Sequence, residues 1–82
     1  MTDALHPLAR DAMRLALRPK AEAEQRIAEL AGGDLAALDE AHRDLCRRLA
    51  LRPHEPPAAE ALRLVHALRD RLRSAARTTL AA

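Results

Sequence analysis

The chain has 82 residues, a formal net charge of +2 at pH 7 and no Phe, Tyr or Trp. This length predicts one domain, residues 1–82, with a small core. The low net charge does not indicate a polyanionic partner, and the absence of about 18 consecutive apolar residues excludes a transmembrane segment. One Cys excludes an intramolecular disulfide, and the N-terminal residues lack the pattern of a signal peptide. We therefore expect a cytoplasmic protein.

The composition predicts an all-α fold. The chain contains 15 Leu and 20 Ala, together with many Arg and Glu, all of which are strong helix formers. No stretch alternates apolar and polar residues for long enough to form a strand. Pro and Gly residues mark the ends of four helices, which we expect at about residues 3–18, 20–31, 34–51 and 57–79. They would form a small bundle of three to four helices, or two stacked helical hairpins.

The first two expected helices meet at Pro19. In the helix at 3–18, apolar residues at spacings of three and four share one face: Leu5, Leu8, Ala12 and Leu15. Pro7 is tolerated because it lies in the first turn, where an N–H has no helical acceptor. Pro19 disfavours a helical conformation at Arg18, so the first helix ends there and the second begins. Gly32-Gly33 ends the second helix, since Gly adopts the left-handed conformation of a helix stop.

Similar residues mark the ends of the helices in the second half of the chain. Asp34 is a good N-cap for the helix at 34–51. The apolar face of that helix is expected to contain Leu38, His42, Leu45 and Leu49. The segment RPHEPP interrupts the chain before the helix at 57–79. In that last helix, heptad steps place five apolar residues in one seam: Ala61, Val65, Leu68, Leu72 and Ala75.

The hexapeptide RLALRP occurs twice, at residues 14–19 and 48–53. The copies are 34 residues apart, and each lies between two expected helices. This spacing indicates an internal repeat joined at Gly32-Gly33. The alternative is coincidence in a sequence made largely of Leu, Ala and Arg, and the sequence leaves both interpretations open.

The segment Lys20–Pro53 resembles a single tetratricopeptide repeat, a helix–turn–helix unit of 34 residues. Five residues stand where that family places the small, apolar and terminal Pro residues of its second helix: Ala41, Leu45, Leu49, Leu51 and Pro53. The first helix departs from the family pattern, because Gln25 and Ala28-Glu29 replace its aromatic residue and its Leu-Gly pair. The resemblance covers one repeat and implies protein–protein binding.

Length and charge predict self-association. The helix at 57–79 would be about 35 Å long, about twice the length of the helix at 20–31, so a short neighbour would leave Leu68, Leu72 and Ala75 uncovered. The segment 19–45 has a charge balance of −4, and the segment 61–82 has +4. We expect a non-enzymatic interaction or oligomerisation module that binds itself as a homodimer, or another protein. The expected interface residues are Leu45, Leu49, Val65, Leu68, Leu72 and Ala75.

A small DNA-associated regulatory protein is the alternative. Arg residues recur at steps of four in the first and last helices, and Arg69, Arg73 and Arg77 are the candidate phosphate contacts. However, the chain has no aromatic residues on which single-stranded bases could stack. Solvated helix faces explain the stripes more simply, so nucleic acid is the less favoured partner.

A metal-binding helical bundle is a lesser alternative. His42 and Cys46 are four residues apart, so both side chains can lie on one side of a helix and supply two ligands to zinc. Further ligands would have to come from other His residues or from a second subunit. Because two ligands do not make a site, we expect no bound metal, no cofactor and no catalytic residues.

Overall fold

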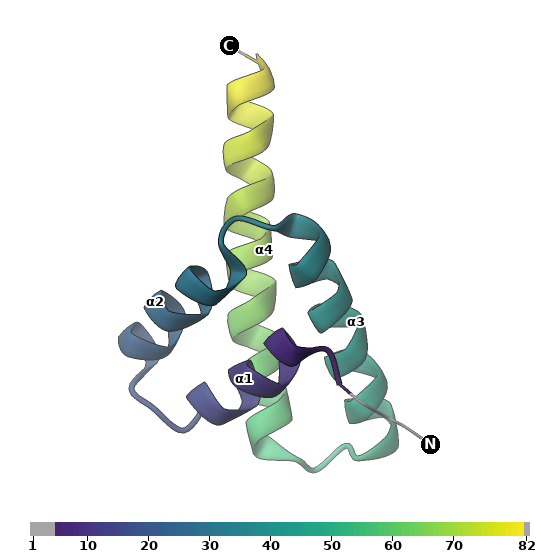
Figure 1. The fold of residues 1–82 in the computed structure, drawn as a ribbon. Helices are drawn as coiled ribbons and strands as arrows, with labels where there is room; N and C mark the ends of the chain where they lie inside the picture. Colours follow the sequence, from purple (N-terminus) through teal and green to yellow (C-terminus); the bar gives the residue numbers. More distant parts are fainter. Residues whose placement is uncertain (1–4, 82) are drawn as a thin grey trace.

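The computed structural model describes residues 5–81 of the chain, and the side chains of residues 5–77. Within this range the chain forms four helices and no strand: α1 (Pro7–Leu15), α2 (Lys20–Ala31), α3 (Leu35–Leu51) and α4 (Pro56–Ala81). α1, α2 and α3 all pack against α4, and the C-terminal turns of α4 extend beyond them (Figure 1). The expected all-α bundle is confirmed, as three shorter helices arranged around one long helix.

The first helix is shorter than the sequence analysis predicts. We expected it at residues 3–18, of which 3 and 4 lie outside the described residues, and α1 covers Pro7–Leu15. Because a residue before proline disfavours the helical conformation, His6 is extended, with φ −52° and ψ 139°, and caps the helix instead of joining it. At the other end the helix stops at the C-cap Ala16. Pro19 is also extended, with φ −54° and ψ 143°, and precedes α2.

The other helix boundaries lie within two residues of the expected ones. The Oδ1 atom of Asp34 accepts a hydrogen bond from the Ala37 N–H at 3.1 Å and so caps the N-terminus of α3. Gly32 and Gly33 have φ values of 58° and 78°, the left-handed conformation that ends α2. α4 begins at Pro56, one residue earlier than expected, and continues to Ala81.

The start of α1 is attached to α3 through His6. The backbone N–H of His6 donates a hydrogen bond to Asp44 Oδ2 at 2.8 Å, and the imidazole Nδ1 accepts one from the Leu8 N–H at 3.1 Å. Since Nδ1 is the acceptor, the neutral ring carries its proton on Nε2, which lies 3.2 Å from Glu40 Oε2. These contacts hold the first turn of α1 against the middle of α3.

Both copies of RLALRP end a helix, but not in the same way. The first copy leaves the helix after Leu15, whereas the second stays helical through Leu51. In the second copy, Arg48 donates two hydrogen bonds to the carboxylate of Glu55, at 2.7 and 2.8 Å. This bidentate pair connects the last turns of α3 to the residue that precedes α4, and it lowers the pKa of Glu55 below its usual value.

The core is built largely from alanine. Seven of the fourteen buried residues among the described side chains are Ala, and the largest that are fully buried are Ile27, Leu38, Leu45 and Val65. Small side chains at the contacts allow helix axes to approach closely, so the helices pack tightly without aromatic residues. The same feature leaves no space for a larger side chain at an alanine contact.

The C-terminal part of α4 makes the molecule elongated. The principal extents are 44, 28 and 18 Å, and the Cα radius of gyration is 12.9 Å. A compact chain of this length has a radius of gyration of about 11.7 Å. The difference agrees with Figure 1, in which α4 rises well above the other three helices.

Replacing a core alanine of α4 should test this packing. Ala61 is fully buried, so Ala61→Leu should reduce the free energy of unfolding by about 1–3 kcal/mol through overpacking. Ala67, on the same helix, is exposed, and Ala67→Leu should change the free energy of unfolding by less than about 0.5 kcal/mol. Urea denaturation of the two variants checks this, and an equal effect at both positions would contradict the described core.

Candidate protein interface

The apolar seam of α4 is only partly covered by the other helices. Ala61 and Val65 are fully buried, and Leu68 is 7% exposed. Leu72 is partly buried and Ala75 is exposed. Our expectation that Leu68 would be uncovered is therefore wrong, because Leu68 belongs to the buried core cluster that forms where the three shorter helices pack against α4. The uncovered part of the seam begins one helical turn later, at Leu72.

The predicted interface residues of α3 lie in or beside the core of the monomer. Leu45 is fully buried, and Leu49 is partly buried against the core cluster. Together with Val65 and Leu68, Leu45 packs inside the folded chain, where it is not accessible to a partner. Of the six predicted interface residues, Leu72 and Ala75 lie at the edge of the core: Leu72 is partly buried and Ala75 is exposed.

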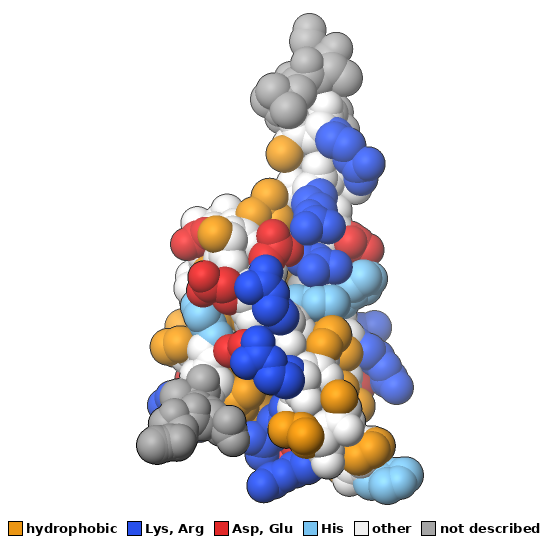
Figure 2. All heavy atoms as spheres, turned by 90° about the vertical axis from the view of Figure 1, so that its right-hand side faces the viewer, with side chains coloured by type: hydrophobic (Ala, Val, Ile, Leu, Met, Phe, Trp, Pro, Cys, Tyr) orange, Lys and Arg blue, Asp and Glu red, His pale blue; other side chains and the backbone are white. Residues whose placement is uncertain are grey.

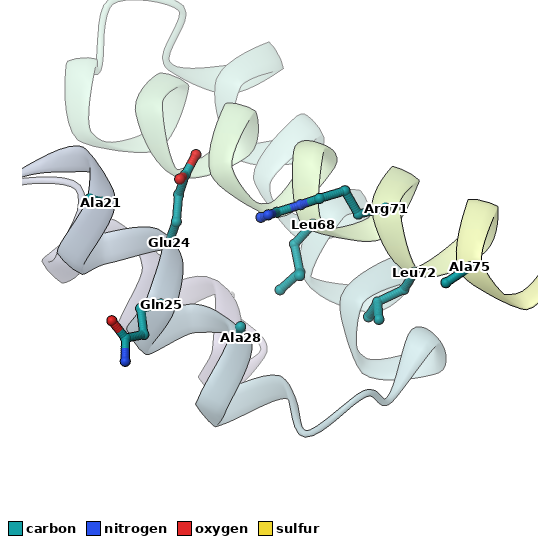
Figure 3. A pocket seen from close by; sticks show the side chains of 8 residues that line it. All are labelled: Ala21, Glu24, Gln25, Ala28, Leu68, Arg71, Leu72 and Ala75. Carbon is teal, nitrogen blue, oxygen red and sulfur yellow. The ribbon is translucent and has the colours of Figure 1, made fainter.

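A groove lies between α2 and α4, where the uncovered seam begins (Figure 3). It has a volume of about 510 Å³ and is open to solvent. Each helix contributes four lining residues: Ala21, Glu24, Gln25 and Ala28 from α2, and Leu68, Arg71, Leu72 and Ala75 from α4. In Figure 3 the side chains of Leu68 and Leu72 extend from α4 toward α2. The groove therefore has an apolar surface that continues directly from the core.

Two opposite charges lie on the two walls of the groove. Glu24 extends from α2 and Arg71 from α4, and their charged ends point into the same space (Figure 3). Among the described residues, neither side chain has a hydrogen bond or an ion pair. The groove is therefore an apolar surface with one unpaired acidic and one unpaired basic group.

The sequence analysis missed the α2 wall of this groove. The face of α2 that packs into the core contains Ala23 and Ile27, which are buried, whereas Leu30 is exposed. The groove uses a second face, on which Ala21, Gln25 and Ala28 recur at spacings of four and three. This spacing of small residues was visible in the sequence, but their low hydrophobicity gave a weak signal.

Beyond the groove, α4 has little contact with the rest of the chain. From Arg73 to Arg77 every residue is exposed. Figure 2 shows basic side chains following this part of α4 as it rises above the other helices. This projecting section is helical through Ala81 and carries a surplus of positive charge.

The candidate phosphate contacts are partly engaged within the chain. Asp39 of α3 lies 3.4 Å from Arg69 and 3.0 Å from Arg73, measured from Oδ1 to the guanidinium nitrogens. The side chain of Arg69 is only 15% exposed. Arg77 is exposed on the projecting section. Phosphate contacts by Arg69 and Arg73 would have to compete with Asp39, so these two residues act in this structure as a link between α3 and α4.

His42 and Cys46 are close to each other, as their spacing predicts. The Cys46 Sγ atom is 3.7 Å from His42 Nδ1, and the His42 ring centroid is 5.5 Å from that of His66 on α4. Within the described residues, no group of three or more His, Cys, Asp or Glu side chains is arranged to hold a metal ion. The pair therefore has two adjacent candidate ligands and no third one in place.

The surroundings of His42 favour its neutral form. Partial burial is the main reason that the pKa of His42 is lowered from 6.5, and the positive charges of Arg69 and of protonated His66 act in the same direction. Asp39 opposes this shift, and Arg73 adds to it. Protonation of His42 would bring another positive charge into the contact between α3 and α4.

No protein-family model, curated protein or solved structure matches the chain. These comparisons therefore do not bear on the resemblance of residues 20–53 to a tetratricopeptide repeat. No helix in the described range is both long and apolar enough to cross a membrane. The groove and the part of α4 that extends beyond it are the features of the described chain that bear on function.

The lowered pKa of His42 predicts a loss of stability in weak acid. The unfolded chain, in which His42 titrates near 6.5, binds more protons than the folded chain, so the free energy of unfolding falls as the pH drops through 6.5 toward the lower folded-state pKa. His42→Gln should reduce this loss between pH 7.5 and 5.5, measured by urea denaturation. His54→Gln, at an exposed His between α3 and α4, is the control and should leave the loss unchanged. An equal pH dependence in the wild type and His42→Gln would contradict the prediction.

Proposed function

We propose that the protein is a non-enzymatic self-association module, and that a second copy of the chain docks on the groove between α2 and α4. The observation that carries this proposal is the continuity of the α4 seam. The apolar seam of α4 is buried at Val65 and Leu68, and it continues through Leu72 and Ala75 onto a surface that is open to solvent. An apolar surface that continues directly from a core is typical of a site covered by another protein.

A second copy has a helix of suitable dimensions for this groove. α2, which forms one wall, has 12 residues and is therefore about 18 Å long. The section of α4 from Arg71 to Ala81 has 11 residues and is about 16 Å long. Alanines at Ala21, Ala28 and Ala75 allow a helix to approach the groove closely. The C-terminal part of α4 from another copy can thus lie along most of the groove.

The distribution of charge also favours a second copy. α2 itself holds three Glu, one Lys and one Arg, a balance of −1, and the section of α4 from Arg71 to Ala81 holds three Arg and no acidic residue, a balance of +3. When α4 of one copy lies near α2 of another, the two segments attract each other. The same contact occurs twice in a twofold dimer, which is the commonest symmetry of small oligomers.

The area that stable dimers usually bury sets the size that the proposed interface needs. Specific interfaces bury about 600–1,000 Å² of each partner. This is about a tenth to a fifth of the 5506 Å² of accessible surface of the monomer. The exposed stripe at Leu72 and Ala75 is too small to supply this area alone. The proposed interface therefore includes the α2 wall and the projecting turns of α4.

A charge placed in the groove should separate the dimer. Leu72→Asp would place a carboxylate in the apolar contact, where desolvation costs several kcal/mol, whereas the fold should survive because Leu72 is only partly buried. Light scattering coupled to size-exclusion chromatography at about 100 μM, a concentration that detects micromolar affinity, should show a dimer for the wild type and a 9.0 kDa monomer for the variant. Circular dichroism should show unchanged helicity.

Ser74→Asp is the matched control, because it introduces the same charge on α4 at an exposed residue that does not line the groove. This variant should remain dimeric. A wild-type protein that is a helical monomer at about 100 μM would contradict self-association. If Leu72→Asp and Ser74→Asp dimerise as well as the wild type, the groove is not the interface.

A further inference from the structure

We infer that the dimer is a closed twofold dimer in which Glu24 of each copy pairs with Arg71 of the other. This inference rests on the proposed self-association and adds the residues that determine the register of the two copies. It goes beyond the apolar contact, because apolar stripes of Leu and Ala can slide past one another, whereas a pair of opposite charges is satisfied at one register only.

Among the described residues, Glu24 and Arg71 remain unpaired while most charged side chains near them are paired. On and near α2, Arg26 lies 3.2 Å from Glu29, and Arg18 lies 3.8 Å from Glu22. On α4, the other charged side chains from residue 60 to residue 73 have partners: Glu60 with Arg63, His66 with Asp70, and Arg69 and Arg73 with Asp39. Glu24 and Arg71 therefore differ from most charges around them in the described part of the chain.

The positions of Glu24 and Arg71 also favour this pairing. Both residues line the groove, one on each wall, and their charged ends point into the space that a docked helix would occupy (Figure 3). A helix in this space would have to present groups that satisfy an acid on the α2 side and a base on the α4 side. A second copy of the chain carries both groups in the same relative arrangement.

The symmetry of a dimer favours the pairing as well. In a twofold interface, a contact from residue i to residue j is accompanied by the same contact from j to i. A Glu24–Arg71 contact is therefore made twice, and both groups of both copies are satisfied. A register that places Glu24 against Glu24 and Arg71 against Arg71 would be repulsive. The charges thus favour one closed arrangement over other alignments of the same apolar surfaces.

Charge reversal tests the inference in the full-length chain. Glu24→Arg and Arg71→Glu each replace two attractive contacts with two repulsive ones, so each should weaken dimerisation by on the order of tenfold, as expected for partly solvated pairs. An equimolar mixture of the two variants should form a heterodimer, because Arg at 24 then meets Glu at 71, and Glu24 meets Arg71. Native mass spectrometry distinguishes this heterodimer from the two homodimers.

The double variant Glu24→Arg with Arg71→Glu should dimerise about as well as the wild type, since both pairs are restored with exchanged signs. Glu22→Arg and Arg77→Glu are controls of the same charge change at exposed positions that do not line the groove. They should dimerise more tightly than the corresponding groove variants, and their mixture should prefer the heterodimer less strongly than the mixture of the groove variants does. Circular dichroism verifies that all variants are folded.

The results distinguish this inference from the proposed function. If the wild type dimerises and Leu72→Asp separates it, but reversal at 24 and 71 has no larger effect than the controls, the proposed pairing is overturned and self-association stands. If Glu24→Arg and Arg71→Glu each weaken dimerisation but their mixture does not favour the heterodimer, the proposed pairing is also overturned. In that case Glu24 and Arg71 would act within one chain. A wild type that remains monomeric would contradict both proposals.

Discussion

The rest of the structure depends on the packing of small side chains against α4. Without aromatic residues, the core has to be closed by helices that approach each other at alanines such as Ala23, Ala41 and Ala61, which are fully buried. Close approach places many atoms of neighbouring helices in contact, but it buries little area for each residue. A core of this kind stabilises a small domain only weakly, so an additional contact with another chain has a large relative effect.

The unequal helix lengths determine where that contact can form. α1 has 9 residues, α2 has 12 and α3 has 17, whereas α4 has 26. Three short helices cannot cover a helix of about 39 Å along its full length. The apolar seam therefore leaves the core within one helical turn, between Leu68 and Leu72. The groove forms at this point, because α2 still provides a wall on one side.

The sequence was sufficient to predict the all-α class and the position of most helix ends, because Asp34, Gly32 and Pro56 act on their immediate neighbours. It was not sufficient to place α2 relative to α4. That crossing depends on how several weakly apolar faces pack together, and it decides that Leu68 is buried and that Ala21 and Ala28 line a groove. The closeness of His42 and Cys46 follows from helix geometry, whereas the contact between Asp39 and Arg69 depends on tertiary packing.

The two sides of α4 have different electrostatic properties, and this difference supports our proposal that a second copy docks on the groove side. On the side facing α3, Asp39 pairs with Arg69 and Arg73 within the chain, and the pKa of His42 is lowered, mainly by partial burial. A partner that bound there would have to displace these contacts. On the side facing α2, Glu24 and Arg71 have no ion pair with any other described side chain and lie beside an apolar surface, so a partner could gain contacts there without displacing one. Because docking removes water from the groove, each new charge pair formed at its edge would be stronger than one on a fully exposed helix.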